Sequence, residues 1–283
     1  MTSFDRRLIP VRPDVAAVQY QDDHLSERYA VGELRQVAYG HCNLHETPCA
    51  DVGLDTQLHC GETFMVYDEK DGWAWGQVTR DGYVGYVRSE GLRRQVEQTT
   101  HRLKVLRSFV YPEPNMKRTP ISCLSMNAEV KVDGDEAGFA KTTQGFVWAA
   151  HLGDKEEGSG SVVENAQRFI GVPYLWGGRT SLGIDCSGLI QEAFLAAGQT
   201  VQRDSDMQEQ SIGTQINLDN SIDGLKSGDL VFWDRHVGIM TDPETVLHAN
   251  AYHMSVASEP LAQAVARIAT VEGPITSIRR VVD

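Results

Sequence analysis

The sequence predicts a multidomain protein in which two small all-β barrels precede an α+β domain. Two observations lead to this prediction: a segment of short strands and turns occurs twice in succession, and the pattern becomes helical after the polar run KEEGSG at 155–160. The chain has 283 residues, enough for two or three domains at about 100–200 residues each. We expect an N-terminal arm (1–35), a first barrel (36–95), a second barrel (96–153) and the α+β domain (154–283).

The first barrel is predicted from β-rich runs that are separated by turn residues. The runs are 64–67, 73–78 and 83–87, and the turns between them contain Gly72 and Gly82. Residues 1–35 show no sustained hydrophobic period, so we expect them to form an arm that packs on the folded body.

The second barrel is predicted because it resembles a fainter copy of the first. Gly72-Trp73 returns as Gly138-Phe139, 66 residues later. The triplet Gly82-Tyr83-Val84 returns as Gly145-Phe146-Val147, 63 residues later, and Glu62 before an alternating strand returns as Glu129. Similarity at a nearly constant spacing is typical of duplicated units, here tandem barrels of about 60 residues each.

The α+β domain begins with a helical pattern. Ser161 and Glu164 have the spacing of a capping box, and apolar residues continue at helical intervals as far as Gly171. A second helix is expected from about Cys186 to Ala197, with Gly198 closing it. Strands follow at 229–233, 237–241, 246–251, 254–258 and 277–281, so helices precede the sheet, as in an α+β domain.

The charge balance argues against a nucleic-acid partner. The chain has 26 Lys and Arg against 39 Asp and Glu, a net charge of -13, whereas a polyanion requires a basic face. Residues 151–283 carry 9 Lys or Arg and 18 Asp or Glu. A cationic or amine-bearing ligand therefore suits this half of the chain better than an anionic one.

The cysteine count and the hydrophobic pattern predict a cytoplasmic protein. Five cysteines are an odd number and a poor disulfide framework, which indicates a reducing compartment. The first 17 residues contain no apolar run of signal-peptide length, and no segment approaches the roughly 18 apolar residues of a membrane span. We therefore expect no membrane partner.

Cys186 is the first candidate for chemistry. It lies between a glycine-rich loop and an apolar helix, which places its sulfur at the helix N-terminus. The helix dipole and unpaired N–H groups there favour a thiolate over a thiol, and the same N–H groups can hold a developing oxyanion. The alternative is a buried, inert cysteine.

Two histidines of one predicted hairpin are candidates for the base that a nucleophilic cysteine needs. If Thr241 pairs with Thr245, His236 faces Asn250 and His248 becomes its diagonal neighbour on the same face of the sheet. One imidazole can then act as base while the next polar group orients it. His253 has the opposite parity, and we expect it at the surface.

These residues resemble a known family, the NlpC-type cell-wall peptidases, which are papain-like cysteine hydrolases. The resemblance covers about residues 161–260 and comprises five blocks in order. The blocks are Pro173-Tyr174-Leu175-Trp176-Gly177-Gly178, Asp185-Cys186-Ser187-Gly188-Leu189, Leu225-Lys226-Ser227-Gly228-Asp229-Leu230-Val231-Phe232, His236-Val237-Gly238-Ile239 and Leu247-His248-Ala249. Residues 36–150 look like the paired bacterial Src-homology-three (SH3) barrels of one branch of that family. That branch comprises the γ-D-glutamyl-L-diamino acid endopeptidases of the dipeptidyl-peptidase six type.

The resemblance implies a hydrolase that cuts L-Ala-γ-D-Glu from the diamino acid of murein peptides during cell-wall recycling, without a metal or another cofactor. It implies that Cys186 is the nucleophile, His236 the general base and His248 the third, orienting residue. The substrate-binding residues that it implies around the thiol are Tyr174 beside the oxyanion, Asp185 on the free amine of L-Ala, and Ser187 and Ser205 near the D-Glu carboxylate.

The same branch of the family closes its pocket with an acidic residue and a tyrosine of the first barrel. The corresponding segment here makes Asp55 and Tyr83 the candidates. Glu46 and Asp51 compete with Asp55 for the acidic position, and Tyr83 could instead belong to the core of the barrel.

Other functions compete with the peptidase hypothesis. A structural zinc ion could use residues of metal-ligand type that gather in the first barrel, although no C-x-x-C pair is present. These residues are His41, Cys42, His45, Cys49, His59 and Cys60. A murein-binding protein with an inactive third domain is another hypothesis, and an amidase or acyltransferase with the same Cys-His-His site is a third.

Overall fold

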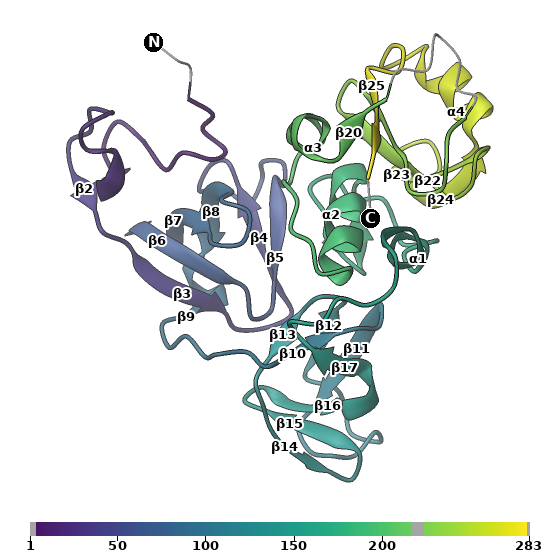
Figure 1. Ribbon diagram of the computed structural model, residues 1–283. Helices are drawn as coiled ribbons and strands as arrows, with labels where there is room; N and C mark the ends of the chain where they lie inside the picture. The colour runs from purple at the N-terminus through teal and green to yellow at the C-terminus, as the bar shows by residue number, and fades with distance from the viewer. Residues whose placement is uncertain (1–3, 217–223, 282–283) are drawn as a thin grey trace. The chain divides into compact units, whose positions relative to one another are not determined.

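The computed structural model describes residues 4–216 and 224–281. The chain divides into two compact units, Met1–Lys155 and Glu156–Asp283, and each is described here by itself (Figure 1). The first unit is built from β-strands, and the second combines helices with a sheet. This is the predicted order of an all-β part followed by an α+β domain. None of the helices in the described residues has the length and apolar character needed to cross a membrane.

The N-terminal arm packs on the first sheet. Its strands Ala16–Ala17 (β1) and Tyr29–Ala30 (β2) pair in parallel, and a 3-10 turn at Val18–Tyr20 (η1) lies between them. Val15 and Ala17 are fully buried in a cluster that the sheet completes with Tyr67, Trp75 and Val84. The arm therefore covers apolar surface that the sheet would otherwise expose to water.

The first sheet has seven strands in the order β5-β4-β8-β7-β6-β3-β9. Its strands are Glu33–Val37 (β3), His41–His45 (β4), Thr56–His59 (β5), Thr63–Lys70 (β6), Trp73–Val78 (β7), Val84–Arg88 (β8) and Leu92–Arg93 (β9). A 3-10 turn at Ser89–Gly91 (η2) leads from β8 to β9. The three predicted runs coincide with β6, β7 and β8. Asp71 and Gly72, both at positive φ, form the tight turn between β6 and β7.

The next segment forms a three-stranded sheet, β13-β10-β17, and a five-stranded sheet, β12-β11-β16-β15-β14. Its strands are His101–Leu103 (β10), Arg107–Tyr111 (β11), Ser122–Ser125 (β12), Glu129–Val130 (β13), Val132–Glu136 (β14), Phe139–Thr142 (β15), Gly145–Trp148 (β16) and Leu152–Asp154 (β17). A 3-10 turn at Ala149–His151 (η3) precedes β17. Both sheets contribute side chains to a single core, for example Leu103 from β10 and Val110 from β11.

The second set of strands repeats the order of the first, strand for strand. If β13 and β14 together correspond to β6, then β12, β11, β16 and β15 occupy the places of β5, β4, β8 and β7, and β10 and β17 those of β3 and β9. Even the 3-10 turn before the last strand recurs. The strand order thus supports the duplication that the sequence predicts.

A buried cluster of charged side chains joins the two copies. Arg80, in the turn after β7, binds Glu62 of the first copy at 2.7 Å and Glu129 of the second at 2.8 Å. The Glu62 side chain is only 1% exposed, and it also accepts the N–H of His59. These are the two glutamates that the internal repeat singled out, and both meet one arginine.

The second unit contains a six-stranded sheet in the order β20-β25-β21-β22-β23-β24 and a separate two-stranded hairpin, β18-β19. Its strands are Arg179–Thr180 (β18), Gly183–Ile184 (β19), Thr214–Gln215 (β20), Leu230–Trp233 (β21), His236–Met240 (β22), Thr245–Asn250 (β23), Ser255–Pro260 (β24) and Ser277–Arg280 (β25). Its helices are Val162–Gln167 (α1), Cys186–Ala196 (α2), Ser205–Ser211 (α3) and Leu261–Ile268 (α4).

Helix α2 is the centre of the second unit. All of its residues are buried, and it packs on α1, β22 and β23. The predicted capping box of α1 is present, because Ser161 and Glu164 exchange their side-chain and backbone hydrogen bonds. Arg179 of β18 and Glu192 of α2 form an ion pair at 2.9 Å with both side chains fully buried, which ties the hairpin to the helix.

Helix α4 was absent from the sequence prediction. Its buried residues Leu261, Ala264 and Ile268 follow helical spacing and pack in the same core as Trp233 and Val246 of the sheet. The helix begins directly after Pro260, where the strand ends, so one continuous segment changes from strand to helix without an intervening loop.

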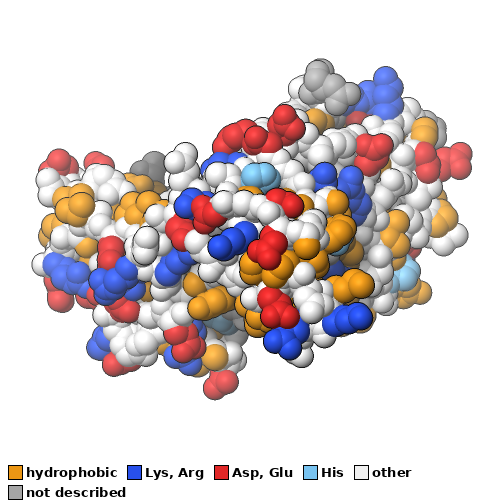
Figure 2. Space-filling model, turned by 90° about the horizontal axis from the view of Figure 1, so that it is seen from below, with side chains coloured by type: hydrophobic (Ala, Val, Ile, Leu, Met, Phe, Trp, Pro, Cys, Tyr) orange, Lys and Arg blue, Asp and Glu red, His pale blue; other side chains and the backbone are white. Residues whose placement is uncertain are grey.

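Acidic and basic side chains are interspersed on the face of the molecule that Figure 2 shows. The net charge of -13 is therefore not gathered into one continuous acidic field on that face.

We predict that Arg80→Ala lowers the free energy of unfolding by about 3 kcal/mol, because it leaves the buried Glu62 carboxylate without its counter-charge. Urea unfolding measures the change. Arg118→Ala is the matched control, since Arg118 pairs with Glu113 through side chains that are 58% and 46% exposed, and we expect a loss of no more than about 0.5 kcal/mol. Equal losses in the two variants would contradict the stabilising role of Arg80.

Candidate active site

Cys186 is the first residue of α2, and Asp185 is its N-cap. The Asp185 side chain accepts the N–H of Gly188 at 2.7 Å, which fixes the first turn of the helix. This turn approaches the glycine-rich loop so closely that a Cβ at Gly188 would lie 2.3 Å from the carbonyl oxygen of Gly178. Glycine is required at position 188 for this approach, and it sets the position of the Cys186 thiol.

Asp185 is held by hydrogen bonds from the protein itself. Its Oδ2 accepts the N–H of Gly177 at 2.8 Å and a guanidinium N–H of Arg203 at 2.6 Å, while Oδ1 accepts from Gly188 and again from Arg203. Asp185 is 8% exposed and Arg203 is 1% exposed. These N–H groups occupy both carboxylate oxygens and give Asp185 a structural role, while the amine contact that the resemblance implies stays a prediction.

The two predicted histidines contact each other. Ile239 pairs with Leu247 and Met240 with Val246, and the Thr241 N–H donates to the Thr245 carbonyl, so the predicted register is confirmed. His236 Nε2 lies 2.8 Å from His248 Nδ1. In this register Gly238 lies opposite His248, and a Cβ on Gly238 would come within 2.6 Å of Val246. Both imidazoles are buried, with His236 6% exposed and His248 fully buried.

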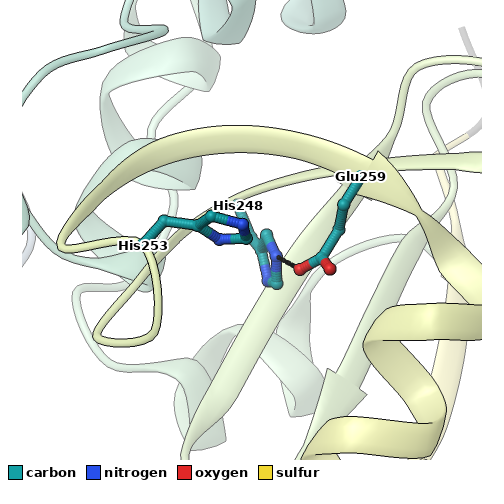
Figure 3. A group of neighbouring side chains, drawn as sticks. All are labelled: His248, His253 and Glu259. Carbon is teal, nitrogen blue, oxygen red and sulfur yellow. Dashed lines mark hydrogen bonds and ion pairs between the residues drawn. The ribbon is translucent and has the colours of Figure 1, made fainter.

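Glu259 extends this pair, and the sequence prediction missed it. His248 Nε2 lies 2.8 Å from Glu259 Oε1, as the dashed line in Figure 3 shows. Arg267 of α4 then binds both oxygens of Glu259, donating to Oε2 at 2.7 Å. His248 pairs with Ala257 in the ladder, so strand alternation places Glu259 on the face of His248. Extending the predicted strand by one residue would have identified it.

The order of donors and acceptors fixes the tautomers of this series. Burial acts to raise the pKa of Glu259, but the hydrogen bonds from Arg267 and His248 lower it to about 2, so Glu259 is a carboxylate and only accepts. His248 must then donate from Nε2, and its Nδ1 accepts the Nε2–H of His236. The one remaining lone pair of His236 is therefore on Nδ1, which is the atom that can take a proton.

Cys186 and His236 line one cavity of about 330 Å³. Tyr174, whose predicted place is beside the reaction centre, lines it as well. The Cys186 Sγ also lies 3.9 Å from the carbonyl oxygen of Arg235, which has a φ of 60° and forms the tight turn before His236. The thiol, the candidate base and a phenol thus share one enclosed volume, the thiol cavity.

Burial determines the protonation of the resting site. It raises the pKa of the Cys186 thiol to about 12, although the N–H groups of Val237 and Ser187 act in the opposite direction. Burial and the neighbouring His248 lower the pKa of His236 to about 3. Desolvation thus acts against the thiolate that the helix N-terminus is expected to favour, and it favours the neutral forms of both groups.

Ser187 and Ser205, the other substrate residues predicted in this unit, are not among the residues that line the thiol cavity. Ser187 is 6% exposed and accepts a hydrogen bond from Arg203, whereas Ser205 is half-buried at the first position of α3. In the first unit, Asp55 is half-buried directly before β5. Tyr83 is 4% exposed in the core cluster of the first sheet, so its predicted role in closing a pocket is corrected to core packing.

The metal-ligand types in the first barrel do not form a metal site. Across the described ranges 4–216 and 224–281, a single group of three ligand types lies close enough to hold an ion, and it consists of His248, His253 and Glu259 (Figure 3). Both ring nitrogens of His248 are already hydrogen-bonded, and Glu259 is bound by Arg267. The geometry therefore favours a hydrogen-bonded series at this position over a metal centre.

Two family models match parts of the chain. The family described as the bacterial dipeptidyl-peptidase SH3 domain matches residues 44–92, and the NlpC/P60 family matches residues 171–271. Neither match extends over 96–153, so a second SH3 domain stays a prediction that the repeated strand order supports.

Several relatives and solved structures resemble the chain. A Gamma-D-glutamyl-L-lysine dipeptidyl-peptidase of Bacillus subtilis is 26% identical over 226 residues, which cover 71% of this chain and 74% of the relative. Dipeptidyl-peptidase 6 of Lysinibacillus sphaericus is 36% identical over 102 residues, 36% of each chain. The fold matches an NlpC/P60 family protein of Bacillus cereus with a TM-score of 0.73 at 17% identity, over 89% of this chain and 100% of that one. Residues 171–271 thus form a domain of the NlpC/P60 family, and an SH3-type domain precedes it in the chain.

Proposed function

We propose that this protein hydrolyses the bond between γ-D-glutamate and a diamino acid in murein peptides that begin with a free L-Ala. The observation that carries the proposal is the hydrogen-bonded series His236–His248–Glu259, whose first member lines the same cavity as Cys186. The name of the Bacillus subtilis relative, which covers 71% of this chain, supports the choice of bond.

The reaction starts from the neutral pair. Nδ1 of His236 takes the thiol proton as the Cys186 sulfur attacks the γ-glutamyl carbonyl carbon, and the N–H groups of Ser187 and Val237 stabilise the charge that develops on sulfur. The carbonyl oxygen becomes an oxyanion, which the start of α2 is oriented to stabilise.

The tetrahedral intermediate collapses when His236 returns its proton to the departing amine, so the C–N bond breaks and a thioester remains on Cys186. Water then attacks the thioester, losing a proton to His236, and the C–S bond breaks to release the carboxylic acid and the thiol. His248 and Glu259 hold the His236 ring in one tautomer through both steps.

We also propose that the reaction serves the recycling of cell-wall peptides in the cytoplasm. The five cysteines are all free, which suits a reducing compartment. The excess of Asp and Glu over Lys and Arg in residues 151–283 suits a substrate whose ends carry amines.

Purified protein should cleave L-Ala-γ-D-Glu-L-Lys into L-Ala-D-Glu and lysine, and Cys186→Ala should abolish the cleavage, because no other group of the thiol cavity provides a thiol. Mass spectrometry of the products measures both. An intact tripeptide after prolonged incubation with wild-type protein would refute the proposed function. Full activity of Cys186→Ala would refute the assignment of the nucleophile.

Glu259→Gln should lower kcat at least about tenfold and leave KM nearly unchanged, because Glu259 contacts His248 and not the cavity. A neutral amide allows the His248 ring to flip or change tautomer, so His236 loses its fixed orientation. Glu244→Gln, in an exposed turn of the same unit, is the control and should keep the wild-type kcat. A change in KM alone would mean that Glu259 does not act through the histidines.

A further inference from the structure

One carboxylate of the thiol cavity has no assigned role. Glu272 lines the cavity with Cys186 and His236, and its Oε2 is buried without a hydrogen-bond partner in the described structure. Burying a carboxylate oxygen away from water without a hydrogen-bond donor costs free energy. Such an oxygen commonly marks a place where a ligand supplies the donor.

Glu272 follows α4, the helix that also carries Arg267, the partner of Glu259. Its N–H donates to the carbonyl of Ile268, the last residue of α4, at 2.8 Å. Arg267, one residue earlier in the same helix, binds Glu259. Glu272 is therefore tied to α4, the helix whose Arg267 also holds Glu259.

Part of the cavity wall is apolar and aromatic. Ile268 and Val271 line it, and Tyr252 lies beneath the guanidinium of Arg267, which is 4.2 Å from the ring centroid. An alkyl chain of a few methylene groups suits such a wall, with a charged group at its far end.

The charged residues that line the cavity with Glu272 include a second carboxylate, Asp234, and two arginines, Arg235 and Arg267. Asp234 also lines the cavity, and its partner Arg235 is distant, at 3.8 Å, with both side chains largely exposed. Arg267 is committed to Glu259. Burial is the main cause that raises the pKa of Glu272; Arg235, which also lines the cavity, acts against it, and Asp234 adds a smaller rise.

We propose that this cavity is the subsite of the departing diamino acid, and that Glu272 binds the ammonium group at the end of its side chain. The proposal rests on the proposed peptidase function and adds a determinant of specificity to it. An alkyl-ammonium residue such as lysine places its methylenes on Ile268 and Val271 and its charge on Oε2 of Glu272, with Asp234 as a second carboxylate nearby.

The test compares L-Ala-γ-D-Glu-L-Lys with L-Ala-γ-D-Glu-L-norleucine, which has a methyl group in place of the side-chain ammonium. Wild-type protein should prefer the lysine peptide by at least about tenfold in kcat/KM, the usual effect of a charge-assisted hydrogen bond. Glu272→Gln should reduce this preference to less than about threefold while the norleucine peptide is still cleaved at the wild-type rate.

Glu244→Gln removes an exposed carboxylate of the same unit and should keep the full preference. Equal cleavage of the two peptides by wild-type protein would overturn the ammonium subsite and leave the peptidase function intact. An unchanged preference in Glu272→Gln would assign the selectivity to another group. Failure of wild-type protein to cleave either peptide would refute the peptidase function itself.

Discussion

The hydrogen bonds of the histidine pair depend on the ion pair between Glu259 and Arg267. Arg267 keeps Glu259 ionised inside the protein, and an ionised Glu259 can only accept. That requirement sets the direction of each following hydrogen bond, from His248 Nε2 to the carboxylate and from His236 Nε2 to His248, so that Nδ1 of His236 is free to take a proton. The pair also anchors α4 to β24, and with it Glu272 at the end of the helix.

A second ion pair fixes the other reactant. Asp185 and Arg203 are almost fully buried, and the carboxylate holds Gly177 of the loop and Gly188 of the helix together at the point where Cys186 begins α2. Cys186 and His236 are buried too, and their burial raises the pKa of the thiol to about 12 and lowers the pKa of His236 to about 3. The fold thus fixes the nucleophile and the base in place but leaves them uncharged, so charge separation awaits the attack on a substrate.

Short sequence patterns predicted two parts of the site, the start of α2 and the contact between the two histidines. The start of α2 at Cys186 follows from a loop-to-helix transition, and the contact of His236 with His248 follows from hairpin register. Glu259 lies one residue past the predicted strand, and Arg267 depends on the docking of α4, a helix absent from the sequence prediction. The ion pair of Asp185 was missed because Arg203 lies 18 residues away in a loop. The repeat predicted the two β segments, but the break of one strand into β13 and β14 depends on packing.

The direction of the hydrogen bonds from His236 to Glu259 is the central claim, and nitrogen NMR of histidine-labelled protein tests it most directly. At pH 6, both His236 and His248 should give the signals of a neutral ring that is protonated at Nε2, because burial lowers the pKa of each. The Cys186→Ala variant should show the same His248 tautomer, since Glu259 sets it. An imidazolium signal from His236 at pH 6 would contradict this direction of the hydrogen bonds, and so would a neutral ring of either histidine protonated at Nδ1.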